Sequence, residues 1–205
     1  MKSSIRQYGD PALRAKGRRV DMIDNRVREL ATDMIETMHA ANGVGLAAQQ
    51  IGEALQLTVL DISQVEDRLS KMKLNGQDVD PKSAMPLVLI NPEIELRAET
   101  EMGTEGCLSF PEISGEIERA KSIIAHAQGL DGDNIAIEAS GFLARAIQHE
   151  VDHLNGILFI DRMSSAAKAA LSSRLKRLQK ETQRGQPRKL SGQDRQSLVS
   201  ETTTL

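Results

Sequence analysis

The segment Q-H-E-V-D-H at residues 148–153 holds two of the four histidines in the chain, and a glutamate directly follows the first. Residues four apart on a helix lie almost above one another, so the imidazoles of His149 and His153 can point at a single atom. This is how a helix binds a divalent metal ion, and Glu150 can then reach a water on the open side of the metal. The spacing therefore favours a metal-dependent hydrolase.

The residues around this segment have the pattern of a helix. Apolar side chains recur with helical spacing at Phe142, Leu143, Ala146, Ile147 and Leu154. We predict Ser140 as the N-cap and a left-handed stop at Asn155-Gly156. The alternative interpretation is an ordinary core helix whose histidines are satisfied by backbone carbonyls.

Cys107 is the only cysteine of the chain and lies in the segment E-G-C-L-S-F-P at residues 105–111. An internal disulfide is therefore impossible, and the thiol is free to act as a ligand or a nucleophile. Taken alone, a buried and inert thiol is the better interpretation. Beside the two histidines, a Cys-His-His set with an open fourth position is favoured, because catalytic zinc-type sites use three protein ligands.

The elements that must position these groups indicate an α+β fold. A helix is predicted from Asn25 to Ala41, and a long polar loop from Ser63 to Met85. Short strands are predicted at Leu57–Ile62, Leu87–Asn91, Glu93–Ala98, Gly115–Arg119, Ser122–Gln128 and Asn134–Glu138. We expect short antiparallel strands packed around a central metal-binding helix, flanked by an N-terminal and a C-terminal helix.

Length and charge divide the chain into a body and a tail. Residues 1–163 suit one catalytic domain, followed by a basic helix at 164–184 and a disordered tail at 185–205. The first 163 residues hold 17 Lys and Arg against 26 Asp and Glu, whereas residues 164–205 hold nine against three. A basic end on an acidic body suggests contact with an anionic surface such as RNA, although a solvated helix face explains it equally well.

Two classes of protein are disfavoured. The chain has no apolar run long enough to cross a bilayer. Its start lacks the apolar segment of a secretory leader, and a single free cysteine suits a reducing compartment. We therefore expect a cytoplasmic protein.

Three segments together resemble the signature motifs of the peptide deformylase family. They are G-V-G-L-A-A-Q-Q at 43–50, E-G-C-L-S at 105–109 and Q-H-E-V-D-H at 148–153, in the order and with the separations of that family. The opening Y-G-D-P-A-L-R at 8–14 is also similar, so the resemblance covers roughly residues 5–163.

The resemblance implies an activity and roles for individual residues. The family removes the N-formyl group from the initiator methionine of nascent chains and releases formate. Cys107, His149 and His153 would bind the metal, Glu150 would be the general acid/base for a metal-bound hydroxide, and the Gln50 side chain and Leu108 N–H would stabilise the oxyanion. The implied physiological metal is Fe²⁺, while Zn²⁺, Ni²⁺ and Co²⁺ are chemically possible substitutes.

Substrate binding is expected on the glycine-rich segment. The backbone of Gly43, Val44 and Gly45 could pair with an extended formylmethionyl peptide as an added strand. Val44 and Leu108, with the helix face near Arg145 and Ala146, are predicted to line a pocket for the methionine side chain. Arg145 and Asn42 differ from some family members, which are apolar or acidic at these positions. Arg119 is either an internal anchor or a plain surface charge.

Two other functions compete with this prediction. A zinc endopeptidase also uses H-E-x-x-H, but the chain does not continue into the extended H-E-x-x-H-x-x-G-x-x-H pattern. A non-catalytic metal-binding or ribosome-associated protein of the same fold is the third possibility, and intact Glu150 and Gln50 argue against it. As partners we expect nascent formylated peptides and, through the basic helix, transient contact with the ribosome, with no stable nucleic-acid binding.

Overall fold

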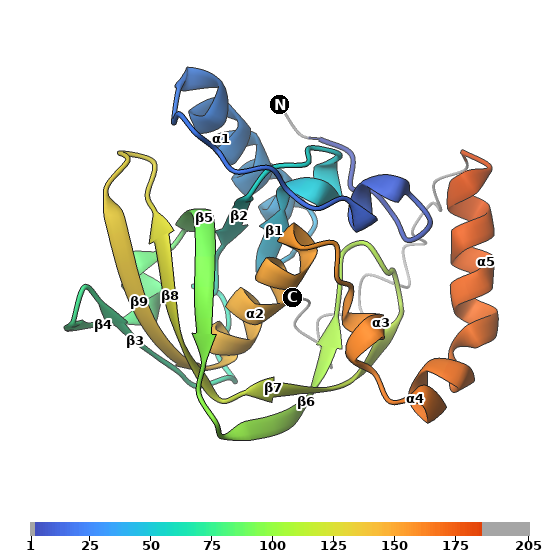
Figure 1. Ribbon diagram of the computed structural model, residues 1–205. Helices are drawn as coiled ribbons and strands as arrows, with labels where there is room; N and C mark the ends of the chain where they lie inside the picture. The colour runs from blue at the N-terminus through green and yellow to red at the C-terminus, as the bar shows by residue number, and fades with distance from the viewer. Residues whose placement is uncertain (1–2, 186–205) are drawn as a thin grey trace.

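The computed structural model describes residues 3–185 (Figure 1). Apart from Gly185, the predicted disordered tail at 185–205 lies outside the described residues. Helices and antiparallel strands are mixed along the chain, which confirms the predicted α+β class. Within the described residues, no helix is both long and apolar enough to span a membrane.

Seven strands form one antiparallel sheet, and two more form a separate hairpin. The order in the larger sheet is β1 (Gly45–Ala47), β2 (Leu57–Leu60), β5 (Leu87–Leu96), β8 (Ser122–Gln128), β9 (Asn134–Gly141), β3 (Ser70–Leu74) and β4 (Gln77–Val79). The hairpin consists of β6 (Thr100–Gly106) and β7 (Ser114–Ala120). Figure 1 shows the strands curving around one central helix, α2 (Phe142–Leu154). All residues of this helix are buried.

Helix α2 starts at a glycine, so the prediction of Ser140 as its N-cap is wrong. Ser140 still belongs to strand β9, and Gly141 takes the cap position with φ of 69°. A side chain at Gly141 would overlap the carbonyl oxygen of Leu69. The chain can therefore pass directly from strand to helix only because glycine allows both the left-handed conformation and the close approach.

Helix α1 (Asn25–Ala40) follows its predicted bounds to within one residue. Asp24 caps it, accepting a hydrogen bond of 3.0 Å from the N–H of Val27. Its apolar stripe, with Ala31, Met34 and Met38 fully buried, packs against β1 and β2. The helix thus supports the strand that leads from Gly43 toward Gln50.

Three strand predictions need correction. The segment predicted as a long loop contains β3, β4 and the short 3-10 helix η3 (Pro81–Ala84), because Asn75 and Gly76 take positive φ and close a hairpin. Strand β5 is continuous from Leu87 to Leu96 through a bulge at Asn91, where two strands were predicted. No strand bounds were predicted for β1 or β6.

The basic end of the described chain packs onto the body. It comprises α3 (Phe159–Arg162), α4 (Ser165–Ala170) and α5 (Ser172–Gln183), so the predicted single helical stretch breaks at Leu171. Leu175 and Leu178 of α5 are buried in a cluster with Phe110. Two further 3-10 helices, η1 (Pro11–Arg14) and η2 (Ala48–Ile51), complete the described elements.

Candidate metal centre

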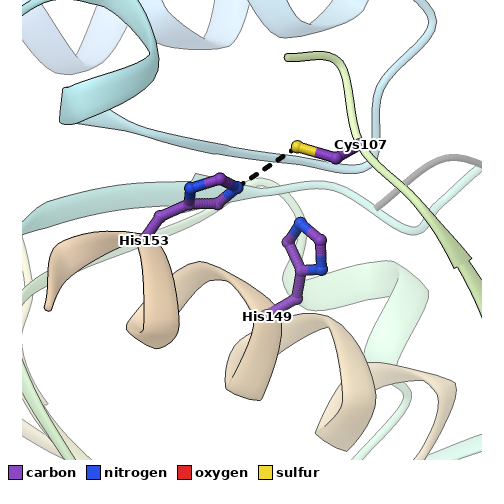
Figure 2. A group of neighbouring side chains, drawn as sticks. All are labelled: Cys107, His149 and His153. Atoms are coloured by element: carbon purple, nitrogen blue, oxygen red, sulfur yellow. Dashed lines mark hydrogen bonds between the residues drawn. The ribbon is translucent and has the colours of Figure 1, made fainter. Parts of the chain in front are cut away.

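Cys107, His149 and His153 lie together in the interior. Each offers one ligand atom, and these atoms all lie within 4.8 Å of one another. The Cys107 Sγ is 3.2 Å from the His153 Nε2, and all three side chains are buried. Figure 2 shows both imidazoles on one face of α2, turned toward the cysteine that follows β6. The structure therefore brings together the three residues that the sequence had proposed as ligands.

The donor atoms have the chemistry that a metal ion requires. The Nδ1 of His149 lies 3.0 Å from the Glu105 carboxylate, while its Nε2 is buried without a hydrogen-bond partner among the described residues. A carboxylate on the outer nitrogen is the usual arrangement for a metal-ligating histidine. Burial lowers the pKa of His153 well below that of a free imidazole, so that ring stays neutral and keeps the lone pair of one nitrogen for a metal.

The Cys107 thiol also fits a cation. Burial, and after it the charge of Glu150, raises the pKa of this thiol far above its ordinary value. A buried thiol of this kind becomes a thiolate only if a positive charge compensates the cost of burial. A divalent ion held between the sulfur and the two imidazoles would supply that charge. The residues present therefore fit a metal ion.

Glu150 is buried against strand β1. Both of its carboxylate oxygens are buried without a hydrogen bond from a described residue. The neighbouring hydroxyl of Thr58 donates its hydrogen to the Leu46 carbonyl at 3.0 Å. Burial, together with the charge of Glu105, raises the pKa of Glu150 well above the usual range of a carboxyl group. Such a group is suited to accepting a proton from a bound water.

Gln50 presents an amide NH₂ to the sulfur. Its Nε2 lies 3.5 Å from the Cys107 Sγ and 3.3 Å from the Ser109 Oγ, and its Oε1 accepts from the N–H of Ala47 at 2.8 Å. The last contact fixes which end of the amide faces the cysteine. The N–H of Leu108 makes no hydrogen bond to another described residue. The Gln50 amide is thus a donor already in contact with the sulfur, and the Leu108 N–H, next to Cys107 in the chain, is a donor without a partner among the described residues.

The glycine-rich segment lies at the edge of the large sheet. Strand β1 is the first in the strand order and pairs with β2, which leaves its other edge without a partner among the described strands. A Cβ on Gly43 would come within 2.6 Å of the Leu108 Cδ1, and one on Gly45 would overlap Glu150. Gly45 is therefore needed for the close approach of the buried Glu150, whereas a side chain at Gly43 would require the Leu108 side chain to move. Val44 is buried, and its carbonyl accepts from Asp61 N at 2.8 Å.

The charged end of Arg145 is bound by the β6–β7 hairpin, and contact of its aliphatic stem with the methionine side chain stays a prediction. Its guanidinium donates to Glu105 and to backbone carbonyls of the β6–β7 hairpin. These acceptors lie 28 to 44 residues earlier in the chain, so no local pattern could indicate them. Helical spacing predicts only that Arg145 lies on the helix face near Ala146.

Arg119 and Glu105 form an ion pair. The sequence offered an internal anchor at Arg119 as one of two interpretations and did not indicate its partner. Arg119 is buried and donates to both Glu105 oxygens at 2.9 and 3.0 Å, and it also donates to Asp152. Of the two interpretations of Arg119, the internal anchor is correct. Burial alone would raise the pKa of Glu105, but hydrogen bonds from His149 and Arg119 outweigh it and lower that pKa. Glu105 therefore stays ionised beside His149.

Comparisons with known proteins agree on one family. A family model described as polypeptide deformylase matches residues 2–169. The peptide deformylase of Opitutus terrae is 43% identical over 184 residues, which is 89% of this chain and 95% of that protein. That of Dictyoglomus thermophilum is 47% identical over 158 residues, 77% of this chain and 90% of its own. The crystal structure of the Thermotoga maritima peptide deformylase matches with a TM-score of 0.68 at 41% identity, covering 80% of this chain and 99% of that one.

Proposed function

The chain belongs to the peptide deformylase family, and we propose that it removes the N-formyl group from the N-terminal methionine of newly synthesised polypeptides and releases formate. One observation supports this activity in addition to family membership. The Cys107, His149 and His153 ligand atoms lie together with the Gln50 amide, and the buried Glu150 carboxylate, which follows His149 on α2, is close enough for its charge to act on the Cys107 thiol. This combination provides a cation site, a base and an oxyanion donor for hydrolysis of an amide.

We infer that Cys107, His149 and His153 hold one divalent ion, with Fe²⁺ as the native metal and Zn²⁺, Ni²⁺ or Co²⁺ as substitutes. A set of one thiolate and two imidazoles accepts all four ions. When bound, the metal supplies Lewis-acid chemistry, since it lowers the pKa of a water toward neutrality and polarises the formyl oxygen. His149 is held for this role by Glu105, which accepts the hydrogen on Nδ1 and leaves Nε2 facing the site.

Glu150 then moves the proton. It accepts one from the attacking water and later donates it to the amine that leaves with the methionine. Gln50 Nε2 and Leu108 N–H donate hydrogen bonds to the oxygen on which negative charge develops. Each such donor is typically worth about 10²–10³ in rate. The bond from Ala47 N–H to Gln50 Oε1 keeps the amide in the required orientation.

The peptide substrate would bind along strand β1. The free edge at Gly43, Val44 and Gly45 can pair with an extended chain, and the missing side chains allow it to approach Glu150. Val44 and Leu108 remain the candidates for contact with the methionine side chain. A substrate made at the ribosome and a free thiol ligand both suit the cytoplasm.

The decisive experiment uses protein purified without oxygen and loaded with Fe²⁺. It should release formate from formyl-Met peptides and leave internal peptide bonds intact. Digestion of casein without formate release would instead identify a zinc-type endopeptidase. Metal binding with neither activity would identify a non-catalytic member of the family. Elemental analysis of the same protein shows which metal it carries.

Gly45→Ala is expected to displace Glu150, because the added methyl overlaps its Oε1. Formate release should fall by about 10²-fold or more, since the base loses its position. Overpacking should also cost about 1–3 kcal/mol of unfolding free energy, measured by urea denaturation. Gly129→Ala is the matched control, because its Cβ would come no closer than 3.9 Å to the Asp133 carbonyl. Equal activity of the two variants would contradict the placement of Glu150.

We propose that α5 gives the protein transient contact with the ribosome. Lys176, Lys180 and Arg184 are exposed and recur every four residues, so they share one face of the helix end. Replacing all three with Glu should weaken sedimentation with ribosomes, most clearly at low salt, and should leave formate release from short peptides unchanged. Deleting the helix is a poorer test, because Leu175 and Leu178 are buried in the core. Ribosome binding that ignores both salt and these substitutions would refute the proposal.

A further inference from the structure

Arg145 links the two elements that supply the metal ligands. It lies one helical turn before His149 on α2 and is only 4% exposed. Its guanidinium donates to four acceptors on the β6–β7 hairpin: the carbonyls of Glu101, Gly103 and Ile117 at 3.0, 3.4 and 2.9 Å, and the Glu105 carboxylate at 2.9 Å. Cys107 directly follows β6, so these bonds join the helix of the histidines to the strand that leads to the cysteine.

The bond to Glu105 reaches the ligands more directly. One Glu105 oxygen accepts from Arg145 Nη1 and Arg119 Nε, and the other lies 3.0 Å from His149 Nδ1 and 3.0 Å from Arg119 Nη2. The carboxylate is fully buried, and its rotation is blocked by bonds from both arginines. An ionised acceptor held in one orientation selects the histidine tautomer with its hydrogen on Nδ1.

Arg119 also joins the β6–β7 hairpin to α2, but it bonds to a different residue of the helix. It starts from β7 and reaches α2 at Asp152, which also accepts from Arg162. The contact lies beyond His149 along the helix, whereas Arg145 precedes it. The two arginines thus hold α2 on either side of the first histidine. Loss of Arg145 leaves Glu105 with one guanidinium, so a variant should still fold around an altered centre.

We propose that Arg145 is a positioning residue that sets the Cys107–His149–His153 geometry before the metal arrives. The inference rests on the ligand assignment of the proposed function. It makes no use of the substrate, so metal binding tests it independently of formate release. Its contribution is preorganisation: ligands already in place lose less freedom when the ion binds.

The direct test measures Co²⁺ affinity by competition with a chelator, in Arg145→Met and Arg145→Lys. Loss of an outer-shell partner typically weakens metal binding 10–100-fold. We expect at least about a tenfold loss for Arg145→Met, and a smaller loss for Arg145→Lys, whose ammonium cannot reach four acceptors. The visible spectrum of bound Co²⁺ should change, and ¹⁵N NMR of the metal-free variant should show a mixed His149 tautomer. A general loss of stability would not alter the tautomer.

Two further variants test whether the position of the Arg145 guanidinium matters in addition to its charge. Gly103→Ala places a methyl 2.9 Å from the Arg145 Cζ, so it displaces the guanidinium without removing it, and it should weaken Co²⁺ binding in the same way. Glu101→Gln is the control, because its carboxylate lies 3.9 Å from Arg145 Nη2 and only its backbone carbonyl accepts a hydrogen bond. It should keep native affinity. If Arg145→Met fails to fold, the Co²⁺ affinity of Gly103→Ala tests the proposal in its place. Native Co²⁺ affinity and an unchanged tautomer in folded Gly103→Ala would overturn the proposal.

Discussion

Glu150→Ala is expected to lower kcat for formate release by about 10²–10⁴-fold, the usual contribution of a general acid/base. The carboxylate is buried without a hydrogen bond from a described residue, so its removal breaks no such contact. Metal content should stay at one ion per chain, because Cys107, His149 and His153 remain. Stopped formate assays and elemental analysis of the same sample measure both quantities.

The companion variant Glu150→Gln keeps the shape of the side chain and removes its basicity. It should be as inactive as the alanine variant, which separates proton transfer from simple packing against Gly45. Full activity in either variant would show that another group carries the proton. Loss of metal in both would mean that Glu150 acts on the ion itself.

Cys107→Ala is the second prediction with a large effect. The thiolate would be the only anionic ligand among the three, so without it the ion should dissociate during purification. Losing a metal that supplies several kcal/mol of transition-state stabilisation corresponds to at least about 10³-fold in rate. Elemental analysis should find little metal, and formate release should fall to the level of the metal-free native protein.

A histidine outside the ligand set provides the control. His126 is exposed on β8, and His126→Ala should keep both metal and activity. If Cys107→Ala retained a full complement of metal, the sulfur would not be a ligand. The centre would then have to rest on the two histidines and Glu150.

Much of the centre could be predicted because its chemistry is local. His149, Glu150 and His153 lie within five residues of one helix, and the helical period alone puts both imidazoles on one face. Cys107 could be joined to them because the chain has no other thiol. Its position 3.2 Å from His153 depends on the packing of the β6–β7 hairpin against α2, which no local pattern encodes.

The strands and contacts that were not predicted are those whose residues depart from the usual hydrophobic pattern of a strand or of a buried helix face. Strand β6 buries Glu105 and exposes Met102, its one large apolar residue, so it lacks the apolar alternation of a half-buried strand. Strands β3 and β4 were predicted as a loop because the segment is polar and contains the turn residues Asn75-Gly76 and Asp80-Pro81; Met72 is the one buried residue of the two strands. Arg145 is a charge buried in the core, and only the fold reveals the Glu105 that compensates it.

The strand order has a consequence for the behaviour of the protein at high concentration. Both outer strands of the large sheet, β1 and β4, are three residues long in the described part of the chain. Very short edges are a device by which sheets avoid pairing with copies of themselves. An edge of this length is still long enough for the first residues of one extended peptide. Under the proposed function, β1 would pair with the end of one substrate peptide, while both outer strands are too short to form an extended sheet with a second copy of the protein.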